Sequence, residues 1–331
     1  MEHIEPRITQ ELRLGADLTP DLHSLLQTHK DRFTTATAAH WGIPHATLHR
    51  AVKRGILTRP MRGFYVRTDV WREAFPEQRH QWLVEALAQR APHLIFAYES
   101  AAAVYGIPRL DKWHSRPQVI SGCRTKRGTH RASVKTFHEP LVAESLQVRG
   151  MRVTDPATTI VDLARRDSMW SAVASADHAV RHKMTDVDAI NERIKSMSGR
   201  TGIARARTYL THIDGRAESV GESWSRILLL LHGFEIPDLQ QSFHDEDGFV
   251  ARCDFHWEDA GIIGEFDGLK KYVDPATLNG RDPRKVLAEE KMREDRLRQL
   301  GLQTVRWIWA DLKDPTRLIR RLKKAGVPRS Q

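Results

Sequence analysis

Residues 252–272 of this chain read RCDFHWEDAGIIGEFDGLKKY, and the rest of the C-terminal sequence is organised around them. Two runs in which apolar residues alternate, 253–257 and 261–267, flank the short polar segment 258–260. Such a pattern predicts two antiparallel strands joined by a tight turn.

The predicted register of this hairpin brings acidic side chains together. If the loop consists of Asp259 and Ala260, Asp254 lies directly opposite Glu265. Side chains alternate between faces with period two, so Asp267 is expected on the same face as Glu265. The opposite, apolar face is then expected to carry Phe255, Trp257, Ile262 and Phe266.

Three carboxylates on one patch require a counter-charge, because like charges on directly opposed residues destabilise a sheet. A divalent cation is one solution, since Mg²⁺ takes oxygen ligands and often uses one or two carboxylates together with a substrate phosphate. The alternative is an ordinary half-solvated hairpin with an acidic polar face. A slip of one residue in the register would remove the opposition of the acids.

Further features of this region resemble the PD-(D/E)XK nucleases, in particular the branch related to very-short-patch-repair endonucleases. The resemblance covers about residues 216–331. It rests on the acids of the hairpin, on AESVGES at the start of a helix, and on EEKMREDRLRQLG followed by the strand-like QTVRWIWADL. It implies a restriction-endonuclease-like α/β domain that hydrolyses phosphodiesters with Mg²⁺ or Mn²⁺.

The resemblance also implies roles for individual residues. Asp254 and Glu265 would be the primary metal ligands, and Asp267 would be a third ligand or would orient the attacking water. Glu222, with Glu218 as the weaker choice, would reach the site from the preceding helix. One departure matters, because Asp267 occupies the position of the usual lysine of that family. The candidates to supply the missing positive charge are Lys271 and Lys291.

Composition restricts the class of protein. The 331 residues are 40% hydrophobic and carry a formal net charge of +10, which favours a polyanionic partner, nucleic acid first. The two cysteines, Cys123 and Cys253, are too few for a disulfide framework, which fits a cytoplasmic location. The longest apolar run, 227–231, is far too short to span a bilayer, and we expect no membrane association.

After a lead-in at residues 1–18, the order of elements predicted for residues 19–68 is that of a winged helix-turn-helix. Thr19 and Pro20 are typical of a helix start, and this first helix is expected to run to about Thr28. A second helix is expected over 34–41 and a third after Pro44. A strand pair at 56–59 and 63–67 follows.

The same segment is strongly basic. Residues 32–68 contain seven Lys and Arg and no Asp or Glu, which is typical of a surface that contacts phosphates. The alternative is a small helical domain with a solvated basic face. In the third helix and the strand pair, the residues expected to contact DNA are His45, Thr47, His49, Arg50, Lys53, Arg54, Arg59 and Arg62.

Residues 20–68 also resemble the N-terminal domain of AbiEi-type antitoxins, through TTATAAHWGI and MRGFYV. The resemblance implies a regulator that binds its own operator and has a cognate toxin. The following region, 69–215, is predicted to be mixed α/β and to become helical towards its end. Its layout resembles the central region of AbiEi-like antitoxins, and we expect a scaffold. A basic stretch at 124–131 is expected to be a solvated loop, with a DNA contact as the alternative.

Together these features predict an α+β, α/β multidomain protein with a winged helix, a mixed scaffold and a C-terminal nuclease-like domain, 216–331. The expected function is DNA binding coupled to metal-dependent endonuclease activity on double-stranded DNA. The alternative is a non-catalytic transcriptional regulator of the antitoxin type, in which the nuclease-like domain holds DNA or forms a homodimer. RNA as the substrate stays open, since no residue pattern discriminates a 2′-hydroxyl.

Overall fold

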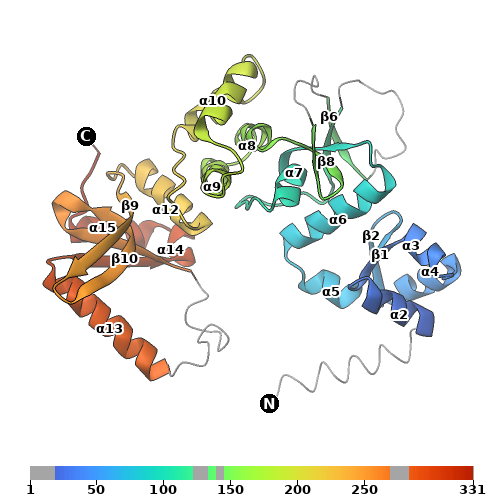
Figure 1. The fold of residues 1–331 in the computed structure, drawn as a ribbon, viewed down its shortest axis with the longest axis horizontal. Coiled ribbons are helices and arrows are strands. Elements are labelled where there is room, and N and C mark those ends of the chain that lie inside the picture. Colours follow the sequence, from blue (N-terminus) through green and yellow to red (C-terminus); the bar gives the residue numbers. More distant parts are fainter. Residues whose placement is uncertain (1–18, 122–132, 139–144, 269–282, 331) are drawn as a thin grey trace. The chain divides into compact units, whose positions relative to one another are not determined.

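A computed structural model describes residues 19–121, 133–138, 145–268 and 283–330 of the chain (Figure 1). The chain forms two compact units, which are described separately. One comprises the residues up to Gly106 together with Lys112–Asp155, and the other comprises Ile107–Asp111 together with the residues from Pro156 onward. Within the described residues, no helix combines the length and apolar composition that crossing a membrane requires.

The first unit begins with three short helices and a three-stranded sheet, an arrangement consistent with the predicted winged helix. The strand order of the sheet is β1-β3-β2, so β3 lies in the middle. The prediction missed the first, three-residue strand. The elements are α2 (Pro20–Thr28), β1 (Arg32–Thr34), α3 (Thr35–His40), α4 (His45–Lys53), β2 (Leu57–Met61) and β3 (Phe64–Arg67).

Local signals in the sequence explain where these helices begin. Pro20 is the first residue of α2, where its missing N–H costs nothing. The Thr34 side chain accepts a hydrogen bond from the Thr37 backbone N–H and so caps α3. Leu48 and Ala51 on the inner face of α4 pack into a core with Leu25 of α2, as the apolar spacing predicts.

The rest of the first unit is a five-stranded mixed sheet with helices, as predicted for this part of the chain. The strand order is β6-β5-β4-β8-β7. Phe64 and Val66 of β3 share a core with Leu87 of α6, so the winged region packs on this part of the unit. The elements are α5 (Thr68–Glu73), α6 (Pro76–Arg90), β4 (Ile95–Phe96), α7 (Tyr98–Tyr105), β5 (Gln118–Ser121), β6 (Lys135–His138), β7 (Ser145–Val148) and β8 (Met151–Thr154).

The second unit combines a helical part with a C-terminal sheet. Asp177 of α9 joins the two, because its buried carboxylate accepts hydrogen bonds from Ser223 Oγ (2.7 Å) and Arg226 Nη2 (2.8 Å) of α12. The helical segment assigned to the scaffold therefore packs with the C-terminal domain. The helices of the helical part are α8 (Pro156–Ala164), α9 (Met169–Arg181), α10 (Val187–Ser196) and α11 (Ile203–Leu210), and α12 (Val220–Leu231) is the first helix of the C-terminal domain.

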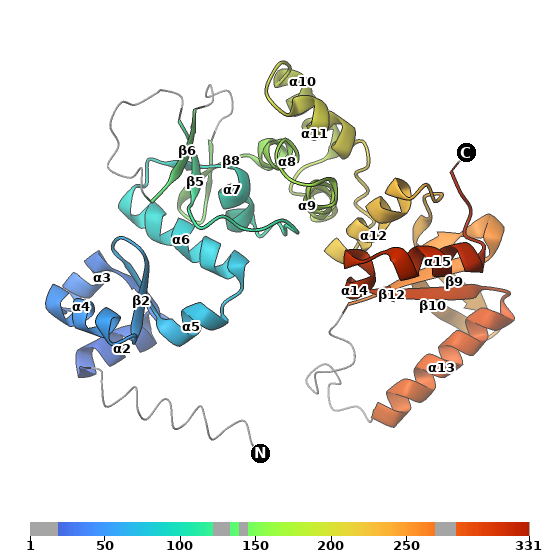
Figure 2. The ribbon, with the colours of Figure 1, turned by 180° about the vertical axis from the view of Figure 1, so that it is seen from behind.

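The C-terminal sheet has the strand order β12-β11-β10-β9, in which β11 and β12 are parallel and the other pairs antiparallel (Figure 2). Helix α12 packs closely on one face, since a Cβ at Gly221 would overlap the Phe266 ring. Leu228 is buried in the core of this domain, whereas Leu231 at the end of α12 is exposed. The elements are β9 (Asp238–Asp245), β10 (Gly248–Trp257), β11 (Ile262–Asp267), α13 (Pro283–Gln299), β12 (Gln303–Ile308), α14 (Trp309–Lys313) and α15 (Thr316–Ala325).

Candidate functional site

Helix α4 presents a polar, basic face to solvent. Because Leu48 and Ala51 face the core, His49 and Arg50, which lie between them in sequence, point outward. Arg50 is held over the first turns by a hydrogen bond from its Nη2 to Thr47 Oγ1 (3.4 Å). Thr47 is half-buried, and the other residues expected to contact DNA are all exposed: His45, His49, Arg50, Lys53, Arg54, Arg59 and Arg62.

Two of the seven Lys and Arg residues in the segment 32–68 do not belong to the exposed basic face of α4 and the β2–β3 hairpin. Arg67 is paired with Asp31 (3.0 Å) and Asp69 (2.7 Å), which lie just outside the acid-free stretch, and Arg32 lies 3.7 Å from Glu85 of α6. Their charges are largely neutralised inside the unit. The basic surface therefore consists of five cations, three at the end of α4 and two at the β2–β3 hairpin.

In the C-terminal domain, the hairpin forms in the predicted register. Phe255 pairs with Gly264 and Trp257 with Ile262, the same alignment that a two-residue loop at Asp259 and Ala260 predicts. The turn itself is a short 3₁₀ helix at Glu258–Ala260 rather than a two-residue loop. The predicted apolar face is confirmed, because Phe255, Trp257, Ile262 and Phe266 lie in one core cluster.

In β10, the alternation of side chains between the two faces of the sheet is interrupted at Asp254. The prediction assumed a regular strand. Cys253 packs with Ile263 on one face, whereas Phe255 stacks on Trp307 (5.1 Å between ring centroids) on the other. Residues two apart share a face in a regular strand, so the strand is irregular between them. The partner strand is irregular at the same level, since Gln240 has φ +58°.

Next to this irregularity, Asp254 forms a hydrogen bond across the hairpin. The Asp254 Oδ2 accepts a hydrogen bond from the Phe266 backbone N–H (2.8 Å). The Cys253 Sγ lies 3.9 Å from Glu265 Oε1. Burial, with the Glu265 charge as a second cause, raises the pKa of the Cys253 thiol to about 12. Asp254 is thus hydrogen-bonded to the backbone of β11, and Glu265 is buried next to Cys253.

Glu265 is neutralised by arginines. Arg293 of α13 forms a two-pronged contact with it, from Nη1 to Oε1 (3.0 Å) and from Nη2 to Oε2 (3.3 Å). Arg306 of β12 adds a third contact, from Nε to Oε2 (3.0 Å). The carboxylate is only 7% exposed, so these contacts are partly desolvated. The sequence analysis missed both arginines, although Arg306 is the direct partner of Glu265 in the parallel β11–β12 pair.

Glu222 has a structural role at the start of α12. Its carboxylate accepts hydrogen bonds from the Glu218 backbone N–H (2.8 Å) and from Ser219 Oγ (2.8 Å), while the Ser219 side chain caps the Glu222 N–H. This is a variant of the capping box, in which the Glu222 carboxylate accepts from the N–H of the residue before the N-cap Ser219. Burial raises the pKa of Glu222. Gln240 connects the box to the hairpin, donating to Glu222 Oε2 (2.9 Å) and more weakly to Asp254 Oδ1 (3.5 Å).

The remaining predicted site residues are dispersed. Asp267 is half-buried at the end of β11, where it pairs with Ile308 of β12. Lys291 lies exposed on α13, and the α13 cation that reaches Glu265 is Arg293. Lys271 and the basic stretch 124–131 lie outside the described residues.

These contacts test whether the acids suit a divalent metal. Glu265 already holds two guanidinium groups, Asp254 accepts a backbone N–H, and Glu222 caps a helix. Among the described residues, no three His, Cys, Asp or Glu side chains gather in a way that could hold a metal ion. The predicted set of Asp254, Glu265 and Asp267 does not fit a metal as it is placed here.

Two family models match the chain. Residues 21–68 match "Transcriptional regulator, AbiEi antitoxin", and residues 94–212 match "AbiEi antitoxin C-terminal domain". Both matches fall in regions where the sequence resembles that family. Neither of these two models extends past residue 212.

Comparison with individual proteins adds relatives from Mycobacterium tuberculosis. "Uncharacterized protein MT2308" and "Uncharacterized protein Rv2248" are each 31% identical over 188 residues, which is 56% of this chain and 66% of the relative. The crystal structure of the RV2827C protein from the same species is 16% identical and covers 67% of this chain and 86% of that one, with a TM-score of 0.35.

Proposed function

We propose that this protein is a DNA-binding transcriptional regulator of the AbiEi antitoxin type. The observation that carries the proposal is the exposed basic face of α4 and the β2–β3 hairpin on a winged-helix arrangement. The match of residues 21–68 to a transcriptional-regulator family supports the same conclusion. It favours regulation over catalysis as the role of the whole chain.

The geometry suits a helix that enters the major groove of B-DNA. The N-terminal residues of a recognition helix face base edges, and the following turns contact the backbone. His45, Thr47 and His49 occupy the first turns of α4, and Arg50, Lys53 and Arg54 follow. Arg59 and Arg62 on the hairpin would contact flanking phosphates. Duplex RNA is a poorer fit, because its major groove is too narrow for a helix.

A cognate toxin and a second copy of the chain are further parts of this proposal. The match of residues 94–212 to an antitoxin domain supports a toxin as a protein partner. A homodimer would place two α4 helices on two half-sites of an operator, as in other helix-turn-helix regulators.

Selection of bound fragments from genomic DNA tests the proposal. We expect the purified protein to enrich DNA upstream of its own coding sequence, and the variant Thr47→Ala, His49→Ala, Arg50→Ala to lose that enrichment. A matched control is Arg72→Ala, which removes an exposed cation outside α4. Enrichment without sequence preference, or enrichment that survives in the α4 variant, would contradict the assignment of α4 as the reading helix.

A metal-dependent endonuclease is the second candidate function. It is favoured by the chain of contacts from Glu222 through Gln240 to Asp254, which places two carboxylates around one amide on the sheet. It is opposed by the ion pairs of Glu265, which a metal would have to displace. Incubation of the protein with plasmid DNA in Mg²⁺ or Mn²⁺ tests it. Cleavage that is abolished both by chelator and by Asp254→Asn would establish the nuclease function. If the plasmid stays intact, the nuclease function is ruled out and transcriptional regulation is the function that remains.

A further inference from the structure

The positive charge of the chain is concentrated in two segments. Residues 32–68 carry seven Lys and Arg and no acid, and residues 303–331 carry eight Lys and Arg and two Asp. Because the whole chain has a net charge of +10, the residues outside these two segments are net negative. The winged helix accounts for the first segment, and nothing described above accounts for the second.

Helix α15 displays most of the second segment's charge. Leu318 and Leu322, one turn apart, are buried in the core of the C-terminal domain and fix which side of the helix faces inward. The cations therefore all point outward, and each of them is exposed: Arg317, Arg320, Arg321, Lys323 and Lys324.

Three of these cations are not neutralised. Arg321 is paired with Asp311 of α14 (2.8 Å), and it also donates from Nη1 to the Arg306 carbonyl (3.0 Å). Arg320, Lys323 and Lys324 make no ion pair within the described part of the chain. Three unpaired cations within five residues repel one another, so a surface of this kind favours a bound polyanion.

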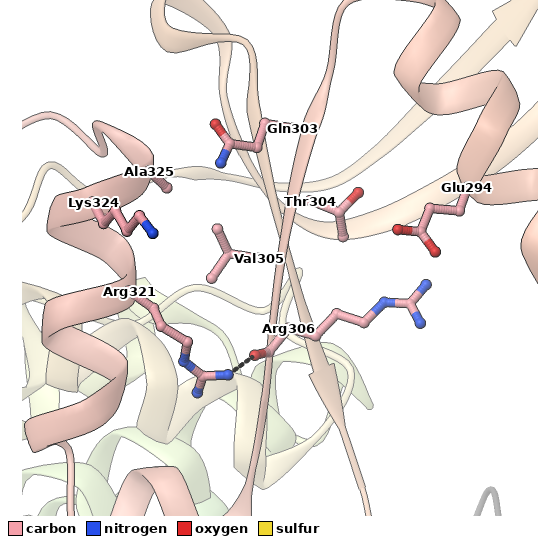
Figure 3. Close-up of a pocket in the computed structure, with 8 residues that line it drawn as sticks. All are labelled: Glu294, Gln303, Thr304, Val305, Arg306, Arg321, Lys324 and Ala325. Carbon is pink, nitrogen blue, oxygen red and sulfur yellow. Dashed lines mark hydrogen bonds between the residues drawn. The ribbon is translucent and has the colours of Figure 1, made fainter.

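A hollow of about 550 Å³ lies beside α15 (Figure 3). Its floor is β12, the edge strand of the sheet, with Gln303, Thr304 and Arg306, and Lys324 and Arg321 line it from α15. Glu294 of α13 is the acid on the far wall, and it lies 3.5 Å from the Arg298 guanidinium. The hollow therefore presents amide, hydroxyl and cationic donors next to the unpaired cations.

We propose that α15 and the hollow beside β12 form a second DNA-binding surface, which holds the phosphodiester backbone without reading sequence. The inference rests on the proposed DNA-binding function and assigns it a separate contact region in the C-terminal domain. Phosphate contacts from Lys, Arg, Ser, Thr and Gln side chains position a protein on duplex DNA and carry no sequence information directly.

The chemistry of the surface favours DNA over a protein partner or a membrane. Protein interfaces are built around buried apolar and aromatic side chains and are depleted of lysine. The outer face of α15 carries five exposed cations and no exposed large apolar side chain. Insertion into a membrane interface needs a free apolar helix face, and here Leu318 and Leu322 are only 1% and 0% exposed.

Titration of labelled duplex DNA over a range of salt concentrations tests the surface. The test variant is Arg320→Gln, Lys323→Gln, Lys324→Gln, which keeps long side chains with good helix propensity. We expect weaker binding to operator and random-sequence duplexes by the same factor. The slope of log K against log salt should fall by about 0.9 for each lost contact, about 2.7 in all. Melting temperature should stay unchanged, since all three positions are exposed.

Two control variants separate the loss of positive charge on α15 from a general effect of substituting three residues. Lys183→Gln, Lys195→Gln, Arg207→Gln removes three exposed cations elsewhere in the same unit and should leave the slope unchanged. Arg320→Lys, Lys323→Arg, Lys324→Arg keeps the charge and should bind as the wild type does.

The outcomes distinguish this inference from the proposed function. Wild-type affinity and slope in the Arg320→Gln, Lys323→Gln, Lys324→Gln variant would overturn the second surface alone. A wild-type protein that binds no duplex DNA would overturn the proposed function as well.

Discussion

At the scale of single residues, the partners of an acid decide what it can do. From the sequence, Glu265 belongs to a patch of repelling carboxylates that needs a metal. In the structure, Arg293 and Arg306 supply the counter-charge from within the chain. The two interpretations predict opposite effects on stability when the acid is neutralised.

Glu265→Gln should destabilise the metal-free protein. The change leaves two guanidinium groups facing a neutral amide in a mostly buried site, and breaking such a pair costs about 3 kcal/mol. Urea denaturation of the wild type and the variant measures the difference. Glu258→Gln in the exposed turn is the matched control and should stay within about 0.5 kcal/mol. A more stable variant would instead support a strained patch of acids.

At the scale of elements, much of the fold could be predicted because its signals are local. The N-terminal helices follow from Pro20, the Thr34 cap and the apolar spacing of α4. The hairpin register follows from strict alternation. The break at Asp254 could not be predicted, because it depends on the partner strand, where Gln240 adopts a positive φ. The pairing of Glu265 depends on contacts across 28 and 41 residues of sequence, which periodicity does not reveal.

Glu222 gives α12 a measurable dependence on pH. Burial raises the pKa of this carboxyl above its usual value of 4.5, so the folded protein keeps the proton to higher pH than the unfolded chain does. The stability that this proton contributes is fully present below about pH 4.5 and is lost as pH rises through the folded-state pKa. The wild type should therefore lose stability relative to Glu222→Gln over this rise.

Thermal unfolding of the two proteins across this pH range measures the effect. Gln at this position can still complete the capping box, so the comparison isolates the charge. A gap that stays constant with pH, or that changes in favour of the wild type as pH rises, would contradict a raised pKa.

At the scale of the whole molecule, a short segment of the chain leaves one compact unit and packs in the other. Ile107–Asp111 belongs to the second unit although the chain on both sides of it belongs to the first. Arg109 anchors the segment through a two-pronged contact with Asp167, with both distances 2.8 Å. Both side chains are buried, at 3% and 8% exposure.

Arg109→Met should destabilise the second unit by about 3–5 kcal/mol, because Asp167 is left as a buried charge without this partner. Hydrogen exchange resolved by peptide should show faster exchange in α8 and α9 and unchanged exchange in the winged helix. Arg116→Met removes an exposed cation close by in sequence and is the control. Equal acceleration in both units would show that they unfold as one.

The central claim is that α4 of the winged helix is the main DNA-contacting element, and the salt dependence of DNA binding tests it most directly. Arg50→Ala, Lys53→Ala, Arg54→Ala removes three exposed cations from α4. We predict weaker binding to operator duplex and a slope of log K against log salt that is smaller by about 2.7, with an unchanged melting temperature. A variant that binds DNA with the wild-type affinity and slope would contradict the claim.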